Sequence, residues 1–233
     1  MSEEEKLIVV PGEEIPAKEV EVKGGQGVYK KDDKYFAATP GLVVLSEEKA
    51  VFMPLESIYI PKPGDVVIGM VISTGTTYWI LDIKAPYTAF LSYQELLSKR
   101  FNPGTALLSL YLKEGDYVIG KISSFDRSRN PTITLRGSDK FGKIIDGTVV
   151  EVKPISVPRI IGRKGSMLNL LVQASNCDMV VGMNGRVYVK CENRDMENVV
   201  ALALKKIEAE THTSGLTDRI RSFLEDHIRG VKK

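Results

Sequence analysis

The stretch Arg159–Gln173, RIIGRKGSMLNLLVQ, decides how the C-terminal part of this chain folds. Gly162-Arg163-Lys164-Gly165 separates two apolar runs, which predicts two helices joined by a short loop bounded by glycines. One interpretation is a tight packing turn whose charges are merely solvated. The other is a loop that holds a phosphate, because glycine lets the main chain approach closely and a helix N-terminus favours an anion. Arg163 and Lys164 would then add positive charge at the tip.

The elements around this loop can be read outward from it. Residues 148–155 predict a strand, and helices are expected at residues 157–162 and 166–175. Gly182-Met183-Asn184-Gly185 then lies between two β-branched runs, and Asn-Gly in that setting is the strongest local signal for a hairpin. A long helix with Asp195 as its cap and a C-terminal helix from residue 216 follow. The apolar side of the long helix is expected to carry Val199, Leu202, Leu204 and Ile207.

The order strand, helix, helix, strand, strand, helix, with Gly-Arg-Lys-Gly between the first two helices, resembles a KH domain. In that family the GxxG loop holds the backbone of about four nucleotides. The resemblance, over residues 144–233, implies that Gly162, Arg163, Lys164 and Gly165 bind RNA. A nucleotide-binding P-loop is excluded, because GRKGS lacks the GxxxxGK[ST] spacing. The packing-turn interpretation stays open.

Residues 62–137 predict five strands with a short helix between the third and the fourth, which is the layout of an OB-fold barrel. Ser92 and Glu95 predict a capping box for that helix. The stretch GDVVIGMVISTGTTYWILDI, from Gly64, is similar to the RNA-binding barrels of ribosomal protein S-one type. Such barrels bind single strands with aromatic platforms and basic loops.

Strand alternation separates the side chains of TYWILDI into two faces. Trp79, Leu81 and Ile83 form the more apolar face and are expected in the barrel core, which leaves Tyr78 on the outer face as the candidate for stacking on a base. The basic residues that would line one rim of the barrel are Lys99, Arg100, Lys121, Arg127 and Arg129. Each of them alone is more often a solvated surface charge, and together they would line the rim if the barrel is closed.

Residues 1–61 differ in character from the rest of the chain. Short apolar runs alternate there with Pro-Gly, Gly-Gly and Asp-Asp breaks, which predicts a small all-β domain. This segment holds 7 Lys and Arg against 12 Asp and Glu, whereas the remaining residues hold 25 against 18. The basic part can meet a polyanion such as nucleic acid, although charge differences of this size also arise by chance.

The composition of the 233 residues is that of an ordinary globular protein, with 43% apolar and 27% charged residues. The sequence shows neither a signal peptide nor an apolar run long enough to span a bilayer. Cys177 and Cys191 are far apart, which predicts neither a disulfide framework nor a zinc site and is most simply explained by a reducing, cytoplasmic compartment. We expect no metal and no cofactor.

A β-rich leader, an S-one barrel and one C-terminal KH module, in this order, are similar to the RNA-binding cap subunit of the archaeal exosome, the family of ribosomal RNA-processing protein four. The stretches that carry the resemblance are VVPGEEI near Val10, YIPKPGDVVIGMV from Tyr59 and VVGMNGRVYVK from Val180. The last contains the family's GxNG motif, at Gly182, Asn184 and Gly185, which implies a structural role in packing the KH domain against the barrel.

The family resemblance implies a non-catalytic function. Three such subunits sit on a hexameric ring of RNase-PH-like subunits, anchored by the leader domain, and RNA is guided 3′ end first into the pore. The resemblance therefore implies single-stranded RNA and this ring as partners, and no membrane.

Other families fit the sequence less well. The zinc-ribbon cap paralogue needs four close cysteines, and polynucleotide phosphorylase places its KH module before the barrel and adds catalytic domains. Elongation factors of the NusA type join a barrel to two KH modules, and this chain has room for one. A small RNA nuclease is disfavoured, because His212 and His227 have no nucleophile at a catalytic spacing and the carboxylates form no recognisable metal cluster.

Overall fold

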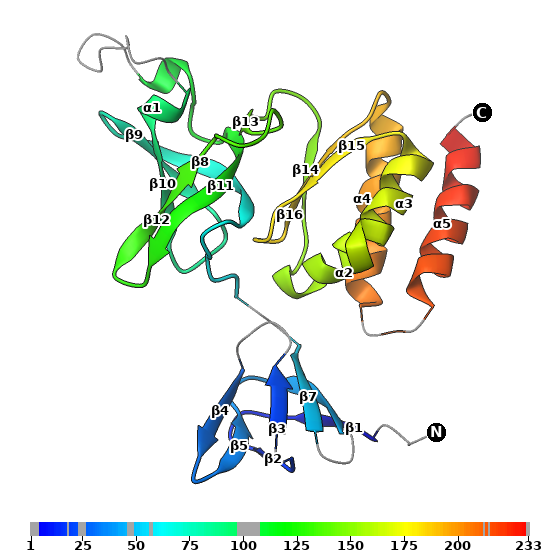
Figure 1. Cartoon of the computed structure of the whole chain (residues 1–233). Helices are drawn as coiled ribbons and strands as arrows, with labels where there is room; N and C mark the ends of the chain where they lie inside the picture. Colours follow the sequence, from blue (N-terminus) through cyan, green and yellow to red (C-terminus); the bar gives the residue numbers. More distant parts are fainter. Residues whose placement is uncertain are drawn as a thin grey trace. The chain divides into compact units, whose positions relative to one another are not determined.

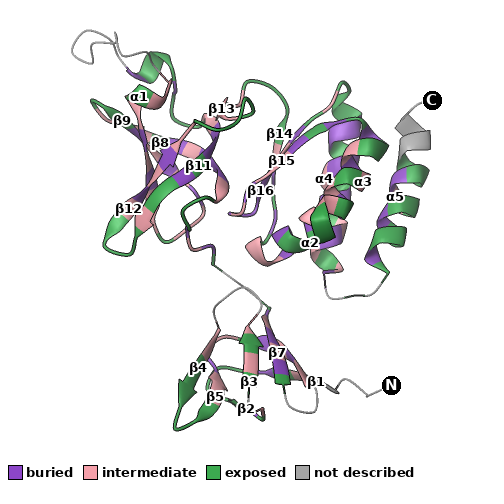
Figure 2. Ribbon diagram, viewed as in Figure 1, coloured by how far each residue is buried: buried purple, intermediate pink, exposed green. Residues whose placement is uncertain are grey.

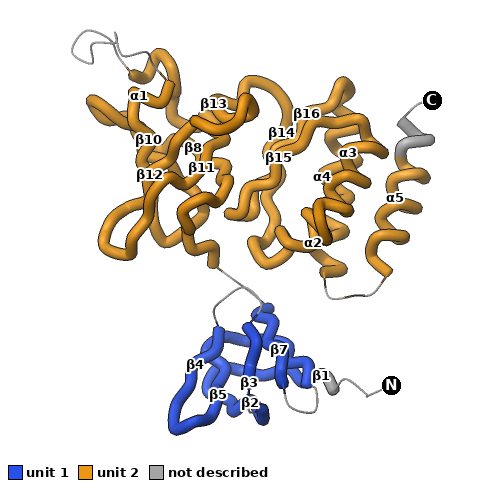
Figure 3. Tube along the Cα trace, viewed as in Figure 1, with its two compact units in different colours: residues 1–57 blue, residues 58–233 orange. Residues whose placement is uncertain are grey.

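The computed structural model describes residues 5–17, 19–22, 27–45, 49–55, 58–96, 108–211, 213 and 215–231. The chain forms two compact units, residues 1–57 and residues 58–233 (Figure 3). The barrel and the KH domain together make up the second unit. Each unit is described by itself below.

The N-terminal unit is built from short strands, as its turn-rich sequence predicts. Its strands are β1 (Glu5–Val9), β2 (Glu14–Ile15), β3 (Glu19–Val22), β4 (Val28–Lys31), β5 (Lys34–Ala37), β6 (Gly41–Leu45) and β7 (Lys49–Pro54). One sheet has the order β1-β6-β7-β3 and the other the order β2-β5-β4. The pair β3–β7 is parallel, whereas the other pairs are antiparallel. The buried apolar core consists of Val9, Ile15, Ala37, Val43, Ala50 and Phe52.

The second unit begins with a closed five-stranded barrel, which confirms the predicted OB-type fold. Its elements are β8 (Val66–Thr74), β9 (Tyr78–Asp82), β10 (Thr88–Ser92), α1 (Tyr93–Leu96), the 3₁₀ turn η1 (Leu108–Leu110), β11 (Tyr117–Asp126) and β12 (Arg129–Thr134). The strand order is β12-β10-β9-β8-β11, and pairing of β11 with β12 closes the barrel. The short strand β13 (Gly142–Lys143) then adds to β11.

The two faces of β9 are those that the sequence alternation predicts. Trp79, Leu81 and Ile83 are fully buried in the barrel core, whereas 39% of Tyr78 is exposed on the outside. The helix α1 differs in detail from the capping-box prediction. The Glu95 carboxylate accepts hydrogen bonds from the Thr134 hydroxyl at 2.7 Å and the Leu135 amide at 2.9 Å, and so joins the helix to the end of β12.

The KH domain follows in the predicted order. Its elements are β14 (Thr148–Glu151), η2 (Pro154–Ser156), α2 (Val157–Ile161), η3 (Arg163–Gly165), α3 (Ser166–Ser175), β15 (Asp178–Val181), β16 (Arg186–Lys190), α4 (Arg194–Ala209) and α5 (Leu216–Val231). The antiparallel sheet has the order β14-β16-β15, and the helices cover one of its faces (Figure 1). The helix α5 packs against α3 and α4 and adds Leu216, Ile220 and Leu224 to the core (Figure 2).

Two details of the long helix α4 differ from the prediction. Its N-cap is Asn193 rather than Asp195, because the Asn193 side chain accepts the Asp195 amide at 2.9 Å. Leu202, expected on the apolar side, is 55% exposed, whereas Val199, Leu204 and Ile207 are buried as predicted.

The prediction for the cysteines is wrong. Cys177 and Cys191 form a disulfide. They flank the β15–β16 hairpin, in which Asp178 lies opposite Lys190, so the hairpin register brings the two thiols together. The cysteine pair therefore gives no indication of a reducing compartment.

Among the helices in the described ranges, none combines the length and the apolar character needed to cross a membrane.

Candidate nucleic-acid interface

The Gly-Arg-Lys-Gly loop leaves α2 after Ile161 and enters α3 at Ser166. Gly162 has φ +73° and ψ 175°, a conformation available in practice only to glycine, and Lys164 and Gly165 also have positive φ. This backbone turns the Arg163 and Lys164 side chains into solvent, and both are exposed. The charged tip of the loop is therefore accessible to a ligand.

The loop lies tightly against the first turn of α3. A Cβ atom at position 162 would lie 2.7 Å from the Met167 amide nitrogen and 2.8 Å from the Ser166 hydroxyl oxygen. Around Gly165, by contrast, a Cβ atom would meet only the Asn169 side chain, at 3.8 Å. The α3 N-terminus has no side-chain cap. Its first amides and the open space at Gly165 are therefore suited to an anionic group.

The outer face of the barrel carries a pair of aromatic rings. Tyr78 on β9 and Phe90 on β10 meet edge to face, with 5.2 Å between ring centroids. Phe90 lies directly opposite Ile80 and beside Thr132 in the strand register. Of the two rings, only Tyr78 was predicted from the sequence. The alternation of inward and outward side chains that identified it also applies to β10, where it places Ala89 and Leu91 inside the barrel and Phe90 outside it.

A second aromatic pair lies near the β11–β12 turn. The rings of Tyr87 and Phe125 have centroids 4.9 Å apart. In the same turn, Arg127 and Arg129 are exposed, and hydrogen bonds from Ser128 lower the pKa of the Asp126 carboxyl. The two arginines thus lie on the turn that follows Phe125, and no sequence spacing indicated Tyr87 or Phe125.

The other basic candidates of the barrel are distributed differently. Lys121 is exposed on β11, opposite Thr134, and so lies along the strand pair away from the turn that holds the arginines. Lys99 and Arg100 lie outside the described residues.

Asn184 of the Gly-Met-Asn-Gly turn joins the KH domain to the barrel. Its side chain is fully buried, accepts the Ile68 amide at 3.2 Å, and donates to the carbonyl oxygens of Ile68 at 2.9 Å and Ile83 at 3.0 Å. Gly182 and Gly185 close the turn through a 3.1 Å backbone hydrogen bond. The turn therefore places an amide side chain within the barrel wall, where both of its polar atoms find partners.

Arg186, two residues further, strengthens the same junction. It is 3% exposed, forms ion pairs with Asp82 at 2.5 Å and Glu151 at 3.1 Å, and donates to the Asp82 carbonyl oxygen at 2.7 Å. Burial acts to raise the pKa of Glu151, but hydrogen bonds from Lys84 and Arg186 outweigh it, so the pKa lies below its ordinary value. Ion pairs thus hold the barrel and the KH domain together, and each charged group in them has a partner of opposite charge.

The loop and the barrel aromatics occupy two separate surfaces. The barrel and the helices lie on opposite sides of the KH sheet (Figure 1), and the Gly-Arg-Lys-Gly loop joins the helices α2 and α3. Within the described ranges, no three His, Cys, Asp or Glu side chains are grouped so that they could hold a metal. His227 is exposed, with a ring nitrogen 2.8 Å from the Phe223 carbonyl oxygen, and His212 lies outside the described residues.

Comparison with known proteins adds to this geometry. A KH domain family matches residues 147–195. The chain is 42% identical to the exosome complex component Rrp4 of Ignisphaera aggregans, over 98% of this chain and 94% of that protein. It is also 42% identical to the protein of the same name from Aeropyrum pernix, over 98% of both chains. A crystal structure described as a proposed exosome complex RNA-binding protein matches with a TM-score of 0.70 and 43% identity, over 76% of this chain and 100% of that one.

Proposed function

This chain belongs to the Rrp4 family of exosome complex components, and we propose that it is an RNA-binding subunit of an exosome. The observation that carries the proposal is the likeness along nearly the whole length of the chain, since the relatives are matched over the leader, the barrel and the KH domain together. A protein that shares only a KH module would be matched only there.

Two surfaces support RNA binding by this chain. The Gly-Arg-Lys-Gly loop presents two exposed cations at an uncapped helix N-terminus, which suits a phosphate backbone. The outer barrel face presents Tyr78 and Phe90, and aromatic rings on a barrel of this type stack bases with little regard to sequence. Together they offer the electrostatic and stacking parts of single-strand recognition.

The finer proposal is that the chain acts as a non-catalytic cap. Three copies would sit on a hexameric ring of RNase-PH-like subunits, with the acidic N-terminal unit as anchor. The barrel and the KH domain would then guide the 3′ end of RNA into the pore, and the ring would cleave it. The separation of a small β unit from the larger barrel–KH unit is consistent with a division between anchoring and RNA binding.

Co-purification tests the cap assignment. The full chain, expressed with an affinity tag in an archaeal host, should retain RNase-PH-like subunits, and the complex should degrade RNA that the isolated chain binds but leaves intact. A chain without residues 1–57 should lose the ring and keep its RNA affinity. Retention of the ring by the shortened chain would contradict the anchoring role.

The same experiment addresses the alternatives. Turnover of RNA by the isolated chain with Mg²⁺ would favour the nuclease interpretation and remove the non-catalytic cap. Recovery of RNA polymerase in place of ring subunits would favour an elongation factor of the NusA type.

A further inference from the structure

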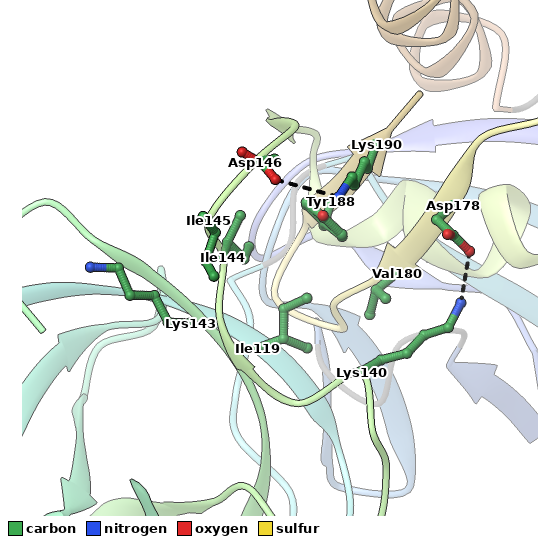
Figure 4. Close-up of a pocket in the computed structure, with 10 residues that line it drawn as sticks. All are labelled: Ile119, Lys140, Lys143, Ile144, Ile145, Asp146, Asp178, Val180, Tyr188 and Lys190. Carbon is green, nitrogen blue, oxygen red and sulfur yellow. Dashed lines mark hydrogen bonds and ion pairs between the residues drawn. The ribbon is translucent and has the colours of Figure 1, made fainter. Parts of the chain in front are cut away.

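A pocket of about 290 Å³ lies between the barrel and the KH sheet, and neither candidate RNA surface uses it. We call it the seam pocket. Residues 140–147, which connect the barrel to the KH domain and are here called the strap, form one side (Figure 4). Ile119 of β11 contributes from the barrel, and Val180, Tyr188 and Lys190 contribute from the uncovered face of the KH sheet.

The walls of the seam pocket are apolar and its rim is charged. Ile119, Val180 and the Tyr188 ring line the interior. Two ion pairs frame the opening, Lys140–Asp178 at 3.2 Å and Lys190–Asp146 at 3.4 Å. Lys143 points away from the pocket in Figure 4 and pairs with Asp116. Because the rim cations are each matched by a carboxylate, the pocket does not suit a free phosphate or another compact anion.

The strap contacts both the barrel and the KH sheet. In its middle, the Ile144 amide donates to the Tyr117 carbonyl oxygen at 2.8 Å, which fixes the strap to the barrel. At its C-terminal end, a Cβ atom on Gly147 would lie 2.5 Å from the Val189 carbonyl oxygen and 2.9 Å from the Tyr188 ring. Glycine at 147 thus lets the strap lie directly against β16.

Two side chains of the pocket suit a flat ligand. The Tyr188 phenol is neutral at neutral pH, so its hydroxyl can donate a hydrogen bond, and burial raises its pKa further above the ordinary value of 10.0. Ile145, on the strap at the opening, is 84% exposed. Contact between a ligand and this exposed side chain would contribute favourably to the free energy of binding, because it removes apolar surface from water.

We propose that the seam pocket binds one nucleobase of a single-stranded RNA, with the base stacked on Tyr188 and its edge hydrogen-bonded to the charged rim. The inference rests on the proposed RNA-binding function and adds a site that lies apart from both the Gly-Arg-Lys-Gly loop and the outer barrel face. A base is flat and uncharged and has donors and acceptors on its edge, which the ammonium and carboxylate groups of the rim match. The volume lies at the lower end for small-molecule sites and suits a ligand of this size.

Fluorescence anisotropy with the full chain tests the proposal. The probes are a labelled ten-nucleotide oligoadenylate and a labelled ribose-phosphate ten-mer without bases. Tyr188→Leu, which keeps an apolar side chain and removes the aromatic ring, should weaken oligoadenylate binding about 5- to 150-fold, since one stacked base contributes about 1–3 kcal/mol. Binding of the abasic ten-mer should be unchanged. Tyr29→Leu, which removes an exposed ring from the N-terminal unit, is the matched control and should leave both affinities unchanged.

A second variant keeps the test decisive if Tyr188→Leu folds poorly. Ile145→Asp changes an exposed strap residue and should weaken oligoadenylate binding at least about threefold, since a base would then bury a carboxylate. Ultraviolet cross-linking of the wild-type chain should also attach RNA to the peptide that holds Tyr188.

The outcomes separate this inference from the proposed function. If the wild-type chain binds neither probe, the RNA-binding function itself fails. If it binds oligoadenylate, but Tyr188→Leu and Ile145→Asp change nothing and the cross-link falls elsewhere, only the seam pocket assignment is overturned.

Discussion

The Asn184 side chain hydrogen-bonds both the amide and the carbonyl group of Ile68, at 3.2 and 2.9 Å, although 116 residues separate the two in the chain. A side-chain amide is a neutral group that can donate and accept in this way at a single position. Asn184 therefore takes the place of a neighbouring strand at this point of β8, and the KH domain is attached to the barrel as if it were part of its hydrogen-bond network.

Asn184→Ala should destabilise the chain by at least about 2 kcal/mol, because the Ile68 amide and the Ile83 carbonyl lose their partner and each unsatisfied group costs about 1–3 kcal/mol. The Ile68 carbonyl oxygen keeps a hydrogen bond from Arg186. Urea unfolding followed by circular dichroism measures the change. Trp79, the one tryptophan of the chain, is buried in the barrel and reports the barrel transition separately. Asn169→Ala, at an exposed site on α3, should change stability by less than about 0.5 kcal/mol. A decrease below about 1 kcal/mol in Asn184→Ala would mean that water replaces its hydrogen bonds.

The junction should weaken in acid through Glu151. Its folded-state pKa lies below the ordinary value of 4.5, so the stabilisation is present above that pH and is lost as the pH falls through the folded pKa. The side chain is 48% exposed, and solvent screening limits the effect to about 1 kcal/mol or less. Urea midpoints measured from pH 6 to pH 3 should fall more steeply in the wild type than in Glu151→Gln. Glu225→Gln, on an exposed position of α5, should follow the wild type; equal slopes in all three proteins would remove Glu151 from the acid response.

The charged tip of the Gly-Arg-Lys-Gly loop should contribute to the salt dependence of RNA binding. Replacing Arg163 and Lys164 by Asp should reduce the slope of log K against log salt by about 0.7 for each phosphate that the loop no longer neutralises. Arg221→Asp, an exposed reversal on α5, provides the comparison and should leave the slope nearly unchanged. An identical slope in the loop variant would leave the packing turn as the explanation of this motif.

The outer barrel face should contribute to affinity without contributing to the salt slope. Tyr78→Ala should weaken binding of single-stranded RNA about 5- to 150-fold if one base stacks there. Tyr78→Phe keeps the ring and should retain the affinity. Titrations at several salt concentrations distinguish this behaviour from that of the loop variant, and a parallel decrease in Tyr78→Phe would assign the effect to the hydroxyl group.

The disulfide should stabilise the KH domain. Cys177 and Cys191 are 14 residues apart, and a loop of that length corresponds to about 3 kcal/mol. Mass spectrometry without reduction should find the two cysteine peptides linked. Reductant should lower the melting temperature of the wild type but not that of the double variant Cys177→Ser, Cys191→Ser, and free thiols in the purified chain would contradict the pairing.

Much of the fold could be predicted from local patterns. Apolar alternation is enough to place Trp79 inside the barrel and Tyr78 outside it, because neighbouring side chains of a strand point to opposite faces. Asn-Gly at 184 and 185 likewise fixes a hairpin, since the flanking strands need only a short turn. These features depend on residues close together in the sequence.

The remaining features depend on contacts that no single segment specifies. Glu95 could not be assigned to Leu135 by spacing, because closure of the barrel brings α1 to the end of β12. The seam pocket needs β11, the strap and the KH sheet at once. The cysteine pair was predictable in principle: once the hairpin register pairs Asp178 with Lys190, the residues just outside it must lie opposite each other.

The way in which Asn184 holds the barrel has a consequence for how such proteins diverge. Asn184 binds peptide groups of Ile68 and Ile83, which every amino acid except proline supplies in full. The hydrogen bonds of Asn184 therefore do not depend on which side chains β8 and β9 carry, and within these strands the joint constrains only Asp82, whose carboxylate pairs with Arg186. Chimeras that keep the turn at residues 182–185 and the Arg186–Asp82 pair, and replace the rest of the barrel sequence, are the natural starting point for transplanting this KH module.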